Sequence, residues 1–113
     1  MTIALTAFTA RGLALAQRLA DGLNAQDDTA AVTPCFGPRH LSLADFTANA
    51  FAQADALVFV GAAGIAVRAI APHLSSKTRD PAVVVLDETG AFAGSLLSGH
   101  LGGANALTLR LAG

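Results

Sequence analysis

Two continuous apolar runs constrain the fold of this 113-residue chain most strongly. They are Ala56–Val60 and Ala82–Leu86, and neither alternates with polar residues. Such runs are typical of parallel strands that helices cover on both faces, because alternation is expected only where one face of a sheet meets water. The segment between them is predicted to be helical over about 65–73. The two runs therefore predict a strand–helix–strand unit in a buried sheet.

The rest of the chain continues the alternation of strands and helices. Thr9 is the predicted N-cap of a helix in which leucines recur at helical spacing, and Ser42 with Asp45 fits the capping pattern of a second helix. Further strands are predicted over 3–7, 30–33 and 92–97, and a last helix over about 101–111. The sequence thus predicts a single α/β domain over residues 1–113. Its three layers are a mainly parallel central sheet and the helices that flank it.

Composition excludes several classes of function. The net charge is −1 and no basic tract is present, so the chain lacks the electrostatic footprint of a nucleic-acid binder. A single cysteine, Cys35, cannot form an internal disulfide, which suits a reducing compartment. No basic leader is visible at the N-terminus, and no apolar run approaches the roughly 18 residues of a membrane span. We expect a cytoplasmic protein that binds neither nucleic acid nor membrane.

The segment Ser95–Asn105 is the strongest candidate for a ligand-binding element. It places Ser98, His100 and Asn105 among several glycines, just before a predicted helix. Glycine lets the main chain approach a ligand closely, and a helix N-terminus offers N–H donors to an anion. His100 is the residue best suited to proton transfer, since its unperturbed pKa lies near neutrality. The alternative is a tight strand-to-helix turn whose glycines serve close packing.

Two further candidate segments also follow predicted strands. Gly61 and Gly64 lie in a strand-to-helix turn with Arg68 one turn later, and Asp87 directly follows the next strand. Ligands in open α/β sheets lie beyond the carboxyl ends of the strands, so these segments are expected to meet there. Adjacent strand residues point to opposite faces, and for that reason Asp87 is preferred to its neighbour as a site residue. The alternatives are a plain tight turn and a solvated arginine.

These motifs together resemble one protein family. In chain order they are Gly64–Pro72, Lys77, Asp80–Glu88, Gly90 and Ser95–Asn105, and they resemble the N-terminal domain of the CbiG family of cobalamin biosynthesis. The resemblance implies a cobalt-precorrin-5A hydrolase, which opens the δ-lactone of a cobalt-containing macrocycle to give cobalt-precorrin-5B and acetaldehyde. For this reaction we expect catalytic roles for His100 and Asp87, which the residues themselves favour. The expected substrate-binding residues are Gly61, Gly64, Arg68, Lys77, Ser98, Gly99, Gly102, Gly103 and Asn105.

The resemblance also sets expectations for cofactors and partners. The substrate is an anionic tetrapyrrole that carries its own cobalt, so we expect no protein-bound metal or other cofactor. The scattered histidines and the one cysteine show no recognised metal-ligand spacing either. The family's C-terminal domain does not follow Gly113 in this sequence, and a domain or protein of that type is an expected partner. Two alternatives remain: a non-catalytic module that binds corrinoid intermediates, and an unrelated small α/β scaffold.

Overall fold

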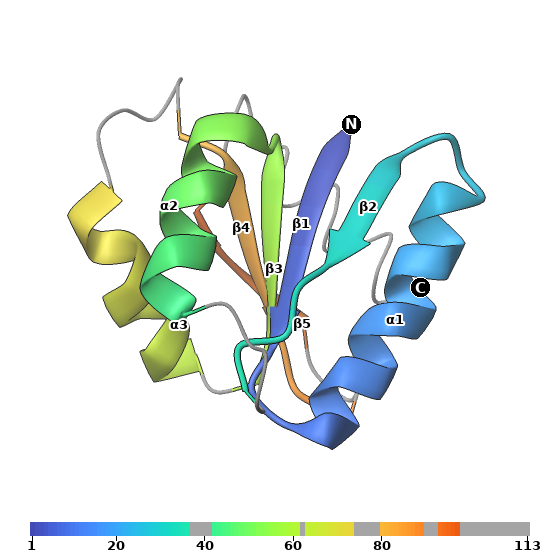
Figure 1. Ribbon diagram of the computed structural model, residues 1–113, viewed down its shortest axis with the longest axis horizontal. Helices are drawn as coiled ribbons and strands as arrows, with labels where there is room; N and C mark the ends of the chain where they lie inside the picture. Colours follow the sequence, from blue (N-terminus) through green and yellow to red (C-terminus); the bar gives the residue numbers. More distant parts are fainter. Residues whose placement is uncertain (37–41, 62, 74–79, 90–92, 98–113) are drawn as a thin grey trace.

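A five-stranded sheet with helices on both faces forms the frame of the protein (Figure 1). The computed structural model describes residues 1–36, 42–61, 63–73, 80–89 and 93–97. In chain order the elements are β1 (Thr2–Ala7), α1 (Ala10–Asn24), β2 (Thr29–Val32), α2 (Leu43–Gln53), β3 (Ala56–Val60), α3 (Ala63–Ile70), the 3₁₀ turn η1 (Ala71–His73), β4 (Ala82–Leu86) and β5 (Ala93–Leu97).

The sheet has the order β2-β1-β3-β4-β5. Neighbouring strands are parallel from β2 through β4, and β5 runs antiparallel to β4. This confirms the predicted three-layer α/β class with a mainly parallel sheet. The chain moves from β1 to β2 on one side and then to β3 on the other, so the direction of winding reverses between β1 and β3. Ligand crevices in such sheets open at this reversal, beyond the carboxyl ends of the strands.

Side-chain alternation along β3 divides the core into two halves. Val58 and Val60 pack in the cluster that α1 covers, whereas Leu57 and Phe59 pack in the cluster that α2 and α3 cover. The Phe59 ring meets the edge of Phe46 from α2 at a centroid distance of 6.0 Å. All five residues of β3 are buried, as are all five of β4. The two apolar runs are therefore central strands covered on both faces, as predicted.

Local signals start the first two helices where the sequence predicts. The Thr9 side chain accepts a hydrogen bond from the Gly12 amide, and the Ser42 side chain accepts one from the Asp45 amide. The buried face of α1 consists of Gly12, Ala16, Ala20 and Leu23, so three of its four residues are small. A Cβ at Gly12 would lie 3.3 Å from the Val60 carbonyl oxygen. Small side chains let α1 lie close to the sheet, and leucines fill the space beside that line of contact.

Three features differ from the prediction or lie outside it. Helix α3 begins at Ala63, two residues earlier than predicted, and ends in η1, where Pro72 cannot donate the next helical hydrogen bond. Asp80, a charged residue for which the sequence indicates no burial, is only 5% exposed at the entrance to β4. The predicted helix over about 101–111 lies outside the described residues.

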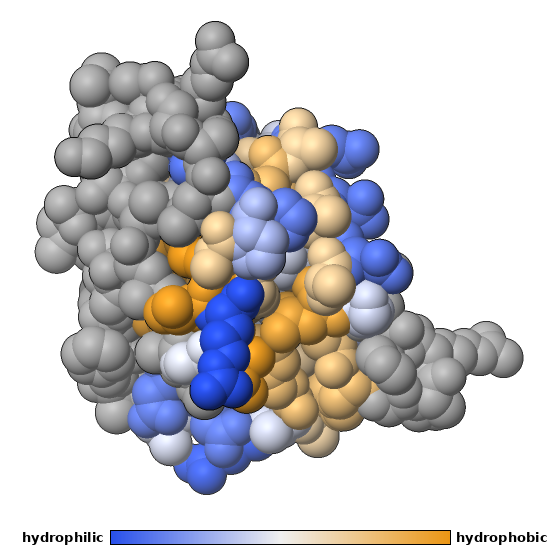
Figure 2. All heavy atoms as spheres, turned by 90° about the vertical axis from the view of Figure 1, so that its left-hand side faces the viewer, coloured by the Kyte–Doolittle hydropathy of each residue, from blue (hydrophilic) through white to orange (hydrophobic). Residues whose placement is uncertain are grey.

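The side of the protein formed by α2 and α3 exposes apolar side chains. Figure 2 shows this side, where hydrophobic residues gather next to strongly hydrophilic ones. Ile65 and Val67 of α3 are 41% and 48% exposed, and they are two of the three large hydrophobic residues that the described part of the chain exposes. Among the described residues, no helix is long and apolar enough to cross a membrane.

Candidate functional site

The carboxyl ends of β1, β3 and β4 lie side by side in register. Ala7 pairs with Val60, and Val60 pairs with Leu86. Directly after these pairs, the Gly61 amide donates a hydrogen bond to the Leu86 carbonyl oxygen at 2.8 Å. The residue that follows Leu86 is Asp87. The structure therefore brings together two of the predicted site segments, Gly61 and Asp87, at the strand-end edge beside the winding reversal.

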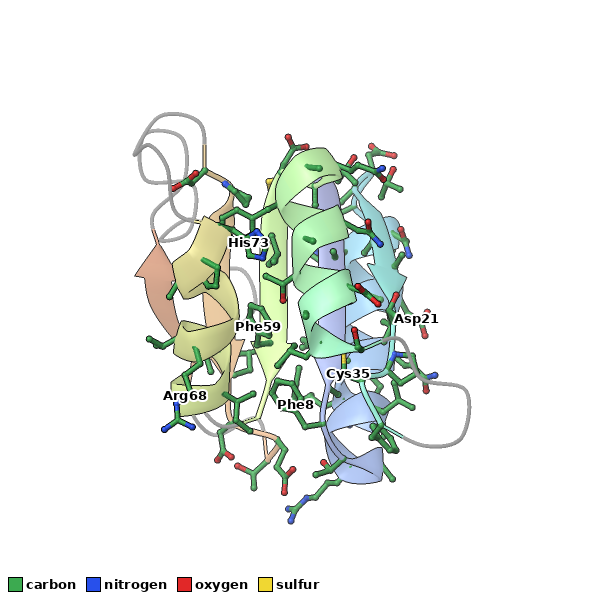
Figure 3. All side chains as sticks on the ribbon, turned by 60° about the vertical axis from the view of Figure 1, so that its left-hand side comes forward. Phe8, Asp21, Cys35, Phe59, Arg68 and His73 are labelled. Carbon is green, nitrogen blue, oxygen red and sulfur yellow. The ribbon has the colours of Figure 1, made fainter. Side chains whose placement is uncertain are left out.

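Gly61 occupies a position that a side chain would disrupt. Its φ of +145° lies in a region that L residues rarely adopt. A Cβ at Gly61 would come within 2.5 Å of Cδ2 of Phe8, whose ring stacks on Phe59 at a centroid distance of 6.4 Å. Figure 3 shows Phe8 below Phe59 at this end of the sheet. The glycine is thus required by the turn and by aromatic packing, so packing alone accounts for its presence.

A hydrogen bond across the end of β3 adds two residues that the sequence did not point to. Thr9 Oγ1 donates to Glu88 Oε2 at 2.7 Å while accepting from the Gly12 amide. Thr9 follows β1 and Glu88 follows β4, and β3 lies between these strands. The Glu88 carboxylate therefore sits at the N-terminus of α1, where the helix dipole favours negative charge. The only sequence signal was indirect: both residues lie two positions past the ends of strands that turn out to be in register.

Asp87 is held as a carboxylate by its neighbours. The Thr89 hydroxyl donates to Asp87 Oδ2, and this hydrogen bond is the main cause of a pKa lowered from the ordinary value. Desolvation, the second-largest effect, opposes this by raising the pKa of Asp87. Backbone hydrogen bonds from Thr89 and Glu88 and the positive charge of Arg11 each lower that pKa by smaller amounts. A carboxyl group with a lowered pKa is ionised near neutrality. It is suited to accepting hydrogen bonds and to orienting a cation, and poorly suited to donating a proton.

Gly64 and Arg68 extend from this edge along α3. Gly64 is exposed, and a Cβ there would meet nothing within 4 Å, so its backbone is open to a neighbouring molecule. Arg68 lines a groove between α2 and α3 and projects from the outside of α3 (Figure 3). Within the described part of the chain, no ion pair involves Arg68.

The other predicted site residues lie outside the described residues. These are Lys77, Ser98, Gly99, His100, Gly102, Gly103 and Asn105. The described part of the site therefore consists of the Gly61 turn, the Thr9–Glu88 hydrogen bond, and Asp87 with its Thr89 and Arg11 neighbours. Its assembled polar groups are two carboxylates, two hydroxyls and a nearby guanidinium.

The contacts of Cys35 and His73 indicate that these two side chains have packing roles. The Thr6 hydroxyl is 2.9 Å from Cys35 Sγ, and burial raises the pKa of that thiol, which lowers its nucleophilicity near neutrality. The His73 ring packs against Phe51 at a centroid distance of 5.4 Å. Among the residues that the structure describes, no group of three or more His, Cys, Asp or Glu side chains is placed to hold a metal ion.

Comparison with known proteins identifies relatives along nearly the whole chain. A protein from Salmonella typhimurium named cobalt-precorrin-5A hydrolase is 49% identical over 114 residues, which cover 99% of this chain and 32% of the relative. A protein of the same name from Priestia megaterium is 48% identical over 62 residues, or 55% of this chain and 17% of the relative. This chain thus spans about a third of the length of the Salmonella typhimurium relative.

A solved structure supports the fold, and a family model gives the family assignment. The crystal structure described as that of a cobalamin biosynthesis protein G homolog from Sulfolobus solfataricus superposes with a TM-score of 0.80. At 24% identity, over 98% of this chain and 33% of that one, the likeness supports the fold. The family model described as Cobalamin synthesis G N-terminal matches residues 45–113, more than half of the chain. The chain belongs to the Cobalamin synthesis G N-terminal family.

Proposed function

We propose that this chain is the N-terminal domain of a cobalt-precorrin-5A hydrolase. In this reaction the δ-lactone of cobalt-precorrin-5A is opened, and a two-carbon fragment leaves as acetaldehyde to give cobalt-precorrin-5B. The observation that carries the proposal is the 49% identity to the Salmonella typhimurium cobalt-precorrin-5A hydrolase over 99% of this chain. The position of Asp87 at the strand-end edge supports it.

Lactone hydrolysis requires an activated water and donors for the developing oxyanion. We assign His100 as the group that takes and returns the proton, because its unperturbed pKa lies near neutrality. The carboxylate of Asp87 would hold the imidazole in orientation and stabilise its protonated form, a role that suits a carboxyl group with a lowered pKa. The backbone N–H groups around Gly99–Gly103 and the Asn105 amide would be the oxyanion donors.

The substrate carries many carboxylates, and the negative charges of Asp87 and Glu88 oppose its binding. Glu88 is tied to the Thr9 hydroxyl, so its charge is directed to the start of α1. Arg68 on α3 and the loop residue Lys77 are the cations that we assign to the substrate's acetate and propionate groups. The exposed backbone at Gly64 would allow the flat macrocycle to approach α3. Cobalt would arrive within the substrate, so the reaction requires no metal ligand from this chain.

The test compares acetaldehyde release by wild type, His100→Ala and Asp87→Asn under anaerobic conditions. The protein is assayed alone and as a chimera, in which this chain replaces the 114 matched residues of the Salmonella typhimurium relative. His100→Ala is expected to slow release by about a hundredfold or more, and Asp87→Asn by about tenfold or more. The matched control is Asp21→Asn, which removes an exposed carboxylate from α1 and is expected to leave the rate unchanged.

Equal rates for all four proteins would exclude catalytic roles for His100 and Asp87. A second function is favoured by one observation, namely that this chain spans only a third of the Salmonella typhimurium relative. In this second function, the domain is a non-catalytic module that binds a corrinoid intermediate and depends on further chain for hydrolysis. Substrate binding without acetaldehyde release by the isolated chain, together with release by the chimera, would establish that function for this domain.

A further inference from the structure

Helix α3 is apolar around almost its whole circumference. Its sequence, AGIAVRAI, contains one charged residue, Arg68. Ala66 and Ile70 are buried against the sheet, while Ile65 and Val67 lie on the two flanks of the helix and are 41% and 48% exposed. Arg68 lies on the side of α3 opposite Ala66 and Ile70, so the outer face of this helix has one charge between two exposed apolar flanks. These flanks are the part of α3 that a further layer would bury.

A groove beside α3 extends this apolar surface to α2. Its volume is about 370 Å³, and Leu43 and Ala44 of α2 face Ile65 and Ala69 of α3 across it. Arg68 lines the same groove and carries its fixed positive charge. Figure 2 looks onto this side of the protein, where hydrophobic residues surround hydrophilic ones. We define the α3 docking face as Ile65, Val67 and the apolar walls of the groove.

The relatives supply an occupant for this face. The Salmonella typhimurium cobalt-precorrin-5A hydrolase is about three times as long as the segment that this chain matches, so roughly two-thirds of it is further chain. We propose that the α3 docking face binds that further chain, whether it is carried on the same polypeptide or on a separate one. This inference rests on the proposed function for the identity of the partner. It requires the partner to present apolar side chains to Ile65 and Val67, and it leaves Arg68 to the substrate carboxylates.

A second copy of this chain fits the face less well. A two-fold interface places the same surface patch on both sides, so the Arg68 side chains of the two copies would lie within one patch. Like charges that are brought together and desolvated oppose association.

The location of the face gives the contact a functional consequence. Ala63, the first residue of α3, lies two positions after Gly61 at the strand-end edge. Chain that covers α3 would therefore lie beside the edge that holds Asp87. A partner docked here would shield that edge from water and reach the substrate directly, and the site would be completed only when the two parts meet.

The test is amide hydrogen–deuterium exchange, which requires no substrate. Exchange in peptides that cover α2 and α3 is expected to be at least about tenfold slower in the chimera than in the isolated chain, with α1 peptides unchanged. The double variant Ile65→Glu/Val67→Glu should abolish this slowing. Both side chains are exposed, so the isolated variant should keep its fold, as judged by circular dichroism. The matched control is Ala14→Glu, which adds a carboxylate at an exposed position of α1 and should leave the slowing intact.

A second measurement tests the same proposal without the chimera, in case the chimera does not fold. The isolated chain is coexpressed with the remaining two-thirds of the Salmonella typhimurium relative, and copurification is expected for wild type and Ala14→Glu but not for Ile65→Glu/Val67→Glu. Three outcomes would overturn the proposal. They are slower exchange confined to α1, equal behaviour of Ala14→Glu and Ile65→Glu/Val67→Glu, and a homodimer of the isolated chain that depends on Ile65 and Val67. These outcomes are independent of acetaldehyde release, so failure of docking and failure of the proposed function are distinguishable.

Discussion

Replacement of Gly61 by alanine is expected to be among the most damaging single-methyl additions in this chain. Two costs combine at this position. The backbone has a φ of +145°, which costs an L residue about 1–3 kcal/mol. The new Cβ would also lie 2.5 Å from Cδ2 of Phe8, and overpacking of this kind costs about 1–3 kcal/mol. The Phe8 ring would have to shift from its stack on the buried Phe59 to relieve this contact. We expect a total loss of about 4 kcal/mol.

Gly64→Ala is the matched control for this substitution. A Cβ at Gly64 meets nothing within 4 Å, and the residue lies in α3, so alanine should stabilise the protein by up to about 1 kcal/mol. Urea unfolding followed by circular dichroism measures both variants. At a slope of about 1–1.5 kcal/mol/M, Gly61→Ala should lower the midpoint by about 3 M. In a Phe8→Ala background the steric cost should disappear, and only the backbone cost of about 1–3 kcal/mol should remain.

Two results would refute this reasoning. A Gly61→Ala midpoint within about 0.5 M of wild type would show that the turn tolerates a side chain. An equal loss from Gly61→Ala with and without Phe8 would show that the aromatic contact contributes nothing to the glycine requirement.

Three further predictions concern the core and the two edges of the sheet. Phe59→Ala should cost about 4 kcal/mol in urea unfolding, because the ring is fully buried; a loss below about 1 kcal/mol would contradict this packing. Asp55→Ala should lower the free energy of unfolding by about 1 kcal/mol, because Asp55 Oδ2 accepts a hydrogen bond from the Thr2 amide at 2.8 Å. Asp55→Asn keeps an acceptor oxygen and should recover most of that loss. Equal losses in the two variants would exclude a contribution from this hydrogen bond. Thr89→Val should raise the pKa of Asp87 toward its ordinary value in a carboxyl carbon-13 NMR titration. Because the pKa of Asp87 is lowered in the folded protein, the stability linked to Asp87 is present above its ordinary pKa of about 3.9 and is lost as the pH falls through the lowered value. An unchanged pKa of Asp87 in Thr89→Val would exclude the Thr89 hydrogen bond as the cause of the lowering.

The candidate site was partly predictable from the sequence. Gly61 and Asp87 each follow a continuous apolar run, and the rule for strand ends was enough to place them together. Thr9 and Glu88 were not predictable as a pair, because they are 79 residues apart and meet only through the sheet order β1-β3-β4. Arg11 entered the site for the same reason, since the sequence places it only on a helix.

The sequence by itself determined the features whose causes are local. Burial on both faces requires every residue of a strand to be apolar, so Ala56–Val60 and Ala82–Leu86 were identified with the bounds that the structure has. The caps at Thr9 and Ser42 depend on hydrogen bonds that span three residues, which a sequence pattern can show.

Only the tertiary structure decided the features that depend on distant neighbours. The place of β5 beside β4 is one such feature. Its antiparallel direction then follows from the six-residue connection, which is too short for the crossover that a parallel pair requires. The burial of Asp80 follows from its place at the entrance to β4, which composition cannot show. The exposed apolar flanks of α3 have the same origin. A helix with a single charged residue is compatible with many positions in a fold, and only the packed layers show which of its apolar sides the domain leaves uncovered.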